Sequence, residues 1–198
     1  MKASVWIVLG VLVAAALVVA VWGTGTYNTL VGLEEQVRGK WSQVESQYQR
    51  RMDLVPNLVA TVQGFAEQEK SVLLGVTEAR ARVGQMNVTR EVLEDPGSFA
   101  RFQAAQDQLS SALSRLLVVS ENYPELKSNE NFLTLQTQLE GTENRIAVER
   151  GRFNEAVREY NTRLRRFPGS LVGSLTGFRA KEYFRSAEGS EKAPAVRF

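Results

Sequence analysis

The chain has 198 residues, enough for one domain of ordinary size with an appended segment. Its 24 basic and 22 acidic residues nearly balance, so the charge gives no sign of general nucleic-acid binding. Cysteine and histidine are both absent, which excludes disulfides and thiolate metal sites and removes the commonest general base and metal ligand. We therefore expect a protein that is not an enzyme and that binds no nucleic acid, cofactor or metal.

An uncharged apolar stretch begins near the N-terminus. It runs from Val5 to Trp22, and at about 1.5 Å per residue in a helix it nearly matches the roughly 30 Å hydrocarbon core of a bilayer. The stretch is longer than the core of a signal peptide, which usually spans about 7–15 residues. We therefore predict a short flank at 1–4 and an uncleaved transmembrane helix at 5–24, bracketed by the interfacial residues Trp6 and Trp22.

Few charges flank the predicted anchor. Lys2 and the terminal amine precede it, whereas Arg38 and Lys40 follow it behind Glu34 and Glu35. Basic residues close to the membrane favour the cytoplasmic side. This pattern favours a cytoplasmic N-terminus and a main domain on the extracytoplasmic side.

The remainder of the chain has helical periodicity. Apolar residues recur at steps of three and four, which gives each helix one apolar face. These runs begin at Leu30, Val55, Phe99 and Phe132 and are separated by polar segments, one of which holds the helix-start signal Asp95-Pro96-Gly97-Ser98. We predict an all-α fold in which 27–167 form an antiparallel four-helix bundle and 168–198 form an irregular C-terminal tail.

The first two helices of this bundle are predicted to join within QRRMDLVPNLVATV, Gln49–Val62. Arg50 and Arg51 suit the end of one helix, Asp53 could cap the next, and Pro56 would fall in its first turn. A continuous helix over 27–83 would be about 85 Å long, more than the later helices could cover. The alternative is three long helices, the first kinked at Pro56.

Polar side chains interrupt the apolar faces. They suggest a candidate buried polar layer made of Arg51, Asp53, Asn57, Glu143, Asn144 and Arg150. Such a layer can fix the register of packed helices, or its side chains can reach solvent; a ligand-binding or catalytic role is a third interpretation. The dimetal sites of four-helix bundles need Glu-x-x-His motifs, which this chain cannot build.

The tripeptide YNT occurs twice, at Tyr27 and at Tyr160. The start of the first helix and the end of the last lie at the same end of an up-down-up-down bundle. We therefore predict that both tyrosines lie at the membrane interface, where an aromatic ring with a polar tip is favoured.

The tail interleaves aromatic and basic residues. They are Phe178, Arg179, Lys181, Tyr183, Phe184 and Arg185. This pattern is typical of a segment that docks on anionic lipid or on a partner. The alternative is that the aromatic residues pack back onto the end of the bundle, while the last dozen residues stay mobile.

Several stretches resemble one known family. They are YNTLV at Tyr27–Val31, QRRMDLVPNLVATVQGFAEQE at Gln49–Glu69, ENYPELKSNENFLTLQTQLEGTENRIAVERGRFNEAVREYN at Glu121–Asn161 and GFRAKEYF at Gly177–Phe184. Together they are similar to the bacterial LemA family. The resemblance implies a single-pass membrane protein with a helical-bundle domain and no known enzymatic activity or cofactor; one branch is linked to the making of magnetosome membranes. It also implies an N-terminus outside the cell, so the orientation stays open.

Two functions fit these observations. The first is a non-enzymatic scaffold or adaptor in the bacterial inner membrane, whose partners are the lipid bilayer and another envelope protein or a second copy of the chain. The second is a membrane-organising protein that acts on lipid through self-association and the C-terminal tail. A carboxylate-based hydrolase is a third, less favoured reading, since no cleft is visible in the pattern.

Overall fold

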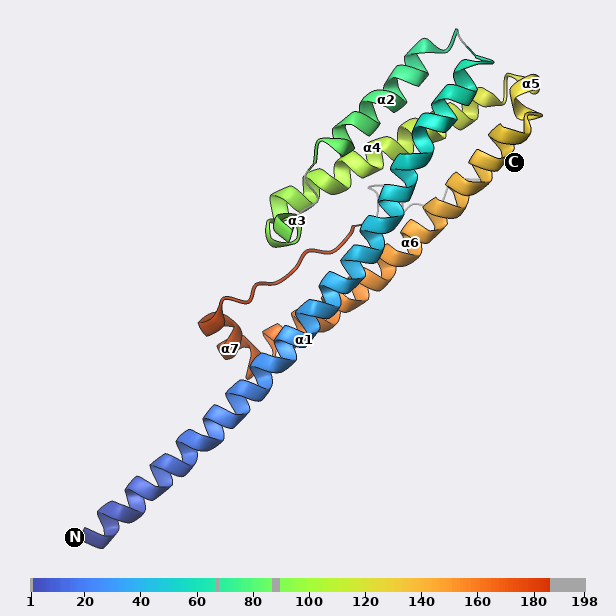
Figure 1. Cartoon of the computed structure of the whole chain (residues 1–198). Helices are drawn as coiled ribbons and strands as arrows, with labels where there is room; N and C mark the ends of the chain where they lie inside the picture. The colour runs from blue at the N-terminus through green and yellow to red at the C-terminus, as the bar shows by residue number, and fades with distance from the viewer. Residues whose placement is uncertain (1, 67, 87–89, 186–198) are drawn as a thin grey trace, which may run out of the picture.

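The computed structural model describes residues 2–66, 68–86 and 90–185 (Figure 1). Across these ranges the chain forms helices and connecting segments, without a strand, which confirms the prediction of an all-α fold. The helices are α1 (Lys2–Gln63), α2 (Lys70–Gly84), α3 (Arg90–Glu94), α4 (Pro96–Ser120), α5 (Pro124–Lys127), α6 (Glu130–Arg165) and α7 (Gly169–Thr176).

Helix α1 joins the apolar N-terminal stretch to the rest of the molecule. It has 62 residues, and at 1.5 Å per residue it is about 93 Å long. Its N-terminal part projects away from the other helices, and side chains from Trp6 to Trp22 are exposed (Figure 1). This part is long and apolar enough to cross a membrane. The helix does not break between the predicted anchor at 5–24 and the domain that follows.

The predicted turn near Met52 is wrong. Helix α1 continues through Pro56 to Gln63, and the chain reverses only over 64–69. Pro56 has no N–H to donate to the carbonyl oxygen of Met52 one turn earlier. The Nε atom of Arg80 in α2 donates to that oxygen over 3.2 Å instead. This contact between helices satisfies the oxygen that the proline leaves free.

The residues that suggested a turn have other roles. Arg50 and Arg51 lie inside α1 rather than at its end, and Asp53 accepts a hydrogen bond from Gln49 over 2.8 Å instead of capping a new helix. The alternative, in which one kinked helix continues to residue 83, is also wrong. Helix α1 ends at Gln63, and 64–69 separate it from α2.

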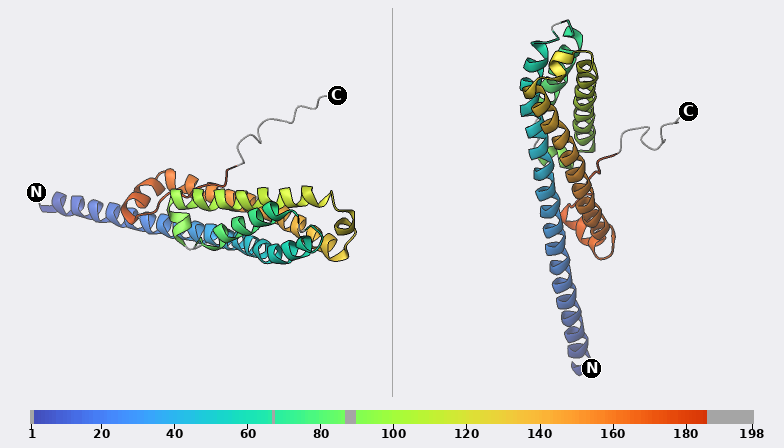
Figure 2. Two further views of the ribbon diagram at one scale, coloured as in Figure 1. Left: turned by 90° about the horizontal axis from the view of Figure 1, so that it is seen from above. Right: turned by 90° about the vertical axis from the view of Figure 1, so that its right-hand side faces the viewer.

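The main helices form two pairs. Successive long helices α1, α2, α4 and α6 alternate in direction, with α6 lying along α1 and α2 lying along α4 (Figures 1 and 2). Helix α2 has 15 residues and α6 has 36. Helices α1 and α6 thus make a long pair and α2 and α4 a shorter one, which lies at the end far from the N-terminus (Figure 1).

Side-chain caps set two helix starts. The Asp95 carboxylate accepts from Ser98 N over 2.6 Å at the start of α4, which confirms the predicted start signal. The Asn129 side chain accepts from Phe132 N over 3.1 Å at the start of α6.

The tail is more ordered than the irregular segment predicted. Residues 169–176 form α7, after which 177–185 run back along the bundle (Figure 1). The rest of the predicted tail, 186–198, lies outside the described residues.

Two hydrophobic clusters make up the core. The first lies nearer the apolar N-terminal part of α1 and includes Trp41, Val44, Tyr48, Phe99, Phe102, Ile146, Phe153 and Phe184. The second lies at the far end and includes Val55, Leu58, Val76, Leu109, Leu113, Phe132 and Leu139. On both α1 and α6, polar side chains lie between the residues of the first cluster and those of the second.

Candidate functional site

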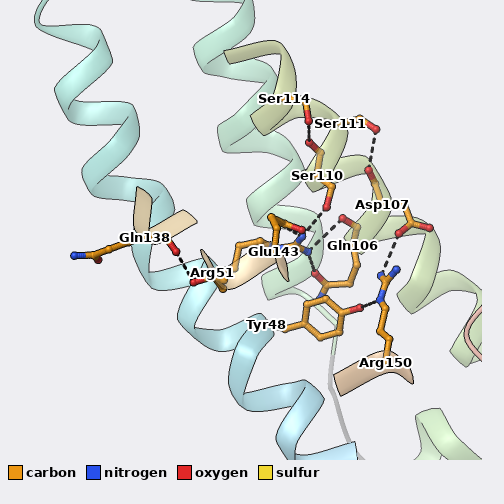
Figure 3. A network of polar contacts seen from close by, with 11 residues as sticks. Tyr48, Arg51, Gln106, Asp107, Ser110, Ser111, Ser114, Gln138, Glu143 and Arg150 are labelled. Carbon is orange, nitrogen blue, oxygen red and sulfur yellow. Dashed lines mark hydrogen bonds and ion pairs between the residues drawn. The ribbon is translucent and has the colours of Figure 1, made fainter. Parts of the chain in front are cut away.

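A polar layer separates the two clusters, and Arg51 is at its centre (Figure 3). Arg51 lies three residues after Tyr48 and four residues before Val55. At this spacing all three side chains lie on the same, inward face of α1. Its side chain is 1% exposed. A charged group so well removed from water must be paired, because an unpaired buried charge costs several kcal/mol (on the order of 3–5).

The partners of Arg51 come from two other helices. Its Nη1 atom donates to Ser110 Oγ over 2.6 Å and to Glu143 Oε1 over 2.7 Å. Its Nη2 atom donates to the side-chain oxygen of Gln106, and to the backbone oxygen of the same residue over 3.3 Å. One guanidinium therefore connects α1 to both α4 and α6.

A second guanidinium lies beside the first. Arg150 Nε donates to the Tyr48 hydroxyl over 2.5 Å, and Arg150 Nη2 lies 3.1 Å from Asp107 Oδ1. Burial raises the pKa of the Tyr48 hydroxyl, although Arg150 and Arg51 partly offset this. Burial opposes the charge of Arg150, but Tyr48 and Asp107 outweigh it and raise the pKa of the guanidinium. Arg150 therefore stays charged.

The six residues predicted for the layer lie in two different environments. The structure brings Arg51, Glu143 and Arg150 together (Figure 3). It leaves Asp53, Asn57 and Asn144 exposed. Successive residues of an α-helix are rotated by roughly 100° about its axis. At their positions in the sequence, these three residues therefore fall outside the inward-facing stripe of their helices. They are not members of the layer.

Sequence reasoning missed the layer's members on α4 and one on α1. These are Gln106, Asp107, Ser110 and Tyr48. A signal for Gln106 was present, since it falls in step with Phe102, Leu109 and Leu113 on the apolar face. No comparable signal marks Asp107 and Ser110, which lie at the edge of that face.

The layer is a paired structural network in which Arg51 donates through Nη1 and Nη2, while its buried Nε has no hydrogen-bond partner among the described residues. A cleft of about 320 Å³ is lined by Arg51, Glu143 and Arg150, but Glu143 Oε1 already holds the guanidinium of Arg51. In the part of the chain that the structure describes, no three acidic side chains gather closely enough to hold a metal ion. The geometry suits fixing the register of α1, α4 and α6.

Amide side chains hold the returning tail segment, which we call the strap (178–185). Asn161 bonds both ways to the backbone of Lys181, at 2.8 and 2.9 Å. Asn154 does the same with Phe184, at 2.9 and 2.8 Å. The two asparagines lie about 10.5 Å apart along α6, and three residues of extended chain span about 10 Å, so the spacings match.

Side chains of the strap also hold it against the helices. The ring of Phe184 lies 5.0 Å from that of Phe99 and 5.4 Å from that of Phe153, within the first hydrophobic cluster. Lys181 Nζ lies 2.9 Å from Glu34 Oε1 and is buried. Phe178 and Tyr183 are partly buried. Only Arg179 and Arg185, of the six tail residues singled out in the sequence, are exposed. This is the packed-back arrangement.

The predicted interface residues do not share one environment. Trp6, Trp22 and Tyr27 are exposed on α1, as contact with lipid or its headgroups requires. Tyr160 is completely buried, and its hydroxyl donates to Arg179 O over 2.9 Å. Tyr27 contacts Phe178, so both tyrosines do lie near the start of the strap. Tyr160 nevertheless faces the protein interior, because the strap covers it.

Comparisons with known proteins identify one family and several relatives. The model of the LemA family matches residues 40–198. Magnetosome protein MamQ 2 of Paramagnetospirillum magneticum is 30% identical over 175 residues, which cover 80% of this chain and 64% of that protein. Magnetosome protein MamQ of Magnetospirillum gryphiswaldense is 29% identical over 174 residues, with the same coverage. The chain thus spans slightly less than two thirds of these relatives.

Proposed function

The chain belongs to the LemA family, and from that premise we propose that it is a non-enzymatic adaptor anchored in the bacterial inner membrane. In this role it holds a helical domain at a fixed distance from the bilayer, where the domain binds another envelope protein. The continuity of α1 carries the proposal. A single helix leads from the candidate membrane span into the domain core without a hinge.

A continuous helix transmits position and orientation, whereas a flexible linker would not. From Trp22 to Gln63 the helix covers about 60 Å at 1.5 Å per residue. Over this length it packs along α6 and carries Arg51 of the polar layer. The domain is therefore attached to its anchor as one body, which suits a protein that places a partner relative to a membrane.

The non-enzymatic part of the proposal rests on the polar layer. Its charged groups are buried or partly buried, paired with one another and shared among three helices. Buried pairs of this kind more often fix packing than perform chemistry.

The side of the membrane is a further part of the proposal. We place the domain outside the cytoplasm, because Lys2 and the amine favour a cytoplasmic N-terminus. The chain has no cysteine, so a single Leu74→Cys variant offers one thiol on the exposed surface of α2. Labelling of intact spheroplasts by a membrane-impermeant maleimide supports this side. Labelling only after lysis contradicts it.

The adaptor role is tested by site-specific photocrosslinking in native membranes. A photoreactive residue is placed at Ala104 or Ser111, which line a groove of about 650 Å³ between α2 and α4. A matched position is Arg158, exposed on α6. One discrete product with a second envelope protein, formed from some positions and not from others, supports the proposal. The absence of any protein adduct from all three positions contradicts it.

The names of the relatives favour a second candidate function. They are magnetosome proteins, which fits a protein that organises or shapes membranes through self-association. Adding the purified full chain to liposomes separates the two functions. Deformed liposomes together with crosslinks between two copies favour membrane organisation, whereas unchanged liposomes count against it.

A further inference from the structure

Helix α7 turns both of its leucines outward, while Val172 packs against the first hydrophobic cluster. Gly169 and Gly173 are buried, and a Cβ atom on Gly173 would overlap Leu164 of α6. Leu171 and Leu175 lie on the opposite face and are 54% and 78% exposed. A surface helix of a water-soluble domain has the reverse arrangement, with its large apolar residues toward the core. The outward face of α7 therefore calls for an apolar environment.

Phe167 extends this face toward the candidate membrane span. It precedes Leu171 by four residues and is 69% exposed. Its ring centroid lies 5.6 Å from that of Trp22, the last residue of the apolar stretch of α1. Figure 1 places α7 beside α1 at the point where the bare part of that helix meets the domain. The apolar face is thus continuous with the surface that would contact lipid.

Basic side chains surround the same place. Arg165 and Arg166 are exposed at the end of α6. Arg163 lines an apolar hollow of about 820 Å³ with Val18, Val21 and Trp22. Its Nε atom is buried and has no hydrogen-bond partner among the described residues. Apolar residues flanked by arginines are characteristic of segments that lie at the bilayer surface, where guanidinium groups meet lipid phosphates.

We propose that Phe167, Leu171 and Leu175 insert into the leaflet from which α1 emerges, with the arginines at the level of the phospholipid phosphates. The protein then touches its membrane twice, through the span and through α7. Two contacts fix the tilt of the domain, which one helix alone does not. The inference rests on the membrane assignment of the N-terminal part of α1 and is independent of whether the domain binds a partner.

The test uses spin labels on the full chain, which has no native cysteine to remove. Single variants Leu171→Cys and Leu175→Cys are labelled and reconstituted in vesicles of phosphatidylethanolamine and phosphatidylglycerol. Leu74→Cys is the matched control, since it is an exposed leucine, 59% accessible, on α2 far from the anchor. Val13→Cys reports on the span itself. All these positions are exposed, so the fold tolerates the label.

Collision rates with oxygen and with a water-soluble nickel complex report the depth of each label. We expect labels at 171 and 175 to collide with oxygen several-fold more often, and with nickel several-fold less often, than the label at 74. Nickel access at 171 and 175 equal to that at 74 overturns the proposal if the label at 13 lies in lipid. A water-accessible label at 13 overturns it together with the anchor.

Discussion

The guanidinium of Arg51 lies 2.7 Å from the carboxylate of Glu143, a residue 92 positions later in the chain. Arg51 stands in the middle of the stretch that the sequence predicts as a turn. In the structure it is instead the centre of a polar layer, with hydrophobic clusters on both sides. The layer fixes how α1, α4 and α6 align, and the continuity of α1 carries that alignment to its apolar N-terminal part.

The first prediction concerns this ion pair. Glu143→Ala leaves the buried guanidinium of Arg51 without its carboxylate, and we expect a loss of about 2–4 kcal/mol in the free energy of unfolding. Arg51→Met removes the charge, so the two substitutions together should cost less than the sum of their separate effects. Urea unfolding in detergent, followed by the fluorescence of buried Trp41, measures this cycle. The exposed pair Arg158 and Glu155 is the control, with a coupling of about 0.5 kcal/mol or less. Additive effects at Arg51 and Glu143 would contradict the layer.

The sequence predicted an apolar N-terminal helix, the helical class and part of the polar layer, because each leaves a pattern within one segment of the chain. Arg51 and Glu143 could be found in this way. The path of α1 through Pro56 could not, because it depends on Arg80 reaching the Met52 oxygen from another helix. The strap could not be predicted either, because the role of Asn154 depends on its hydrogen bond to residue 184, which is far from it in the sequence.

The second prediction tests how α1 tolerates its proline. Arg80→Met leaves the Met52 carbonyl without its donor and should cost about 1–2 kcal/mol of stability. In a Pro56→Ala background the alanine N–H can bond to the same oxygen. The same Arg80→Met substitution should then cost markedly less in urea unfolding. An equal cost in both backgrounds would show that Arg80 acts in some other way.

The third prediction concerns the strap. Asn161→Ala removes both hydrogen bonds to the buried backbone of Lys181, and we expect a loss of about 1–3 kcal/mol. Proteases should then cleave within 178–185 faster than in the unaltered protein, because the segment is released from α6. The matched control is Asn57→Ala, an exposed position on α1. Unchanged protection of the strap in Asn161→Ala would be evidence against this fastening.

The fourth prediction is a dependence on alkaline pH. Burial holds the pKa of Tyr48 above its ordinary value of 10.0 in the folded protein. As the pH rises, the unfolded chain therefore loses this proton first, at about pH 10. The stabilisation is complete below about pH 10 and is lost as the pH rises from there through the folded pKa.

Tyr48→Phe removes this contribution. The free energy of unfolding of the variant should decline less than that of the unaltered chain between about pH 9 and 11. Tyr160→Phe should behave alike, since burial also raises the pKa of Tyr160. Denaturant unfolding at several pH values measures both. Parallel pH profiles for Tyr48→Phe and the unaltered chain would contradict the burial of this hydroxyl.

The most direct test of the central claim is one distance along α1. Spin labels on the variant Val21→Cys/Gln63→Cys, placed in lipid nanodiscs, report the separation of the end of the span from the end of the helix by pulsed electron resonance. One continuous helix predicts a narrow distribution at about 60 Å. A broad distribution would reveal a hinge between anchor and domain, and a distance well below about 50 Å would place a turn within α1. Either result would contradict an adaptor that holds its domain at a fixed distance from the membrane.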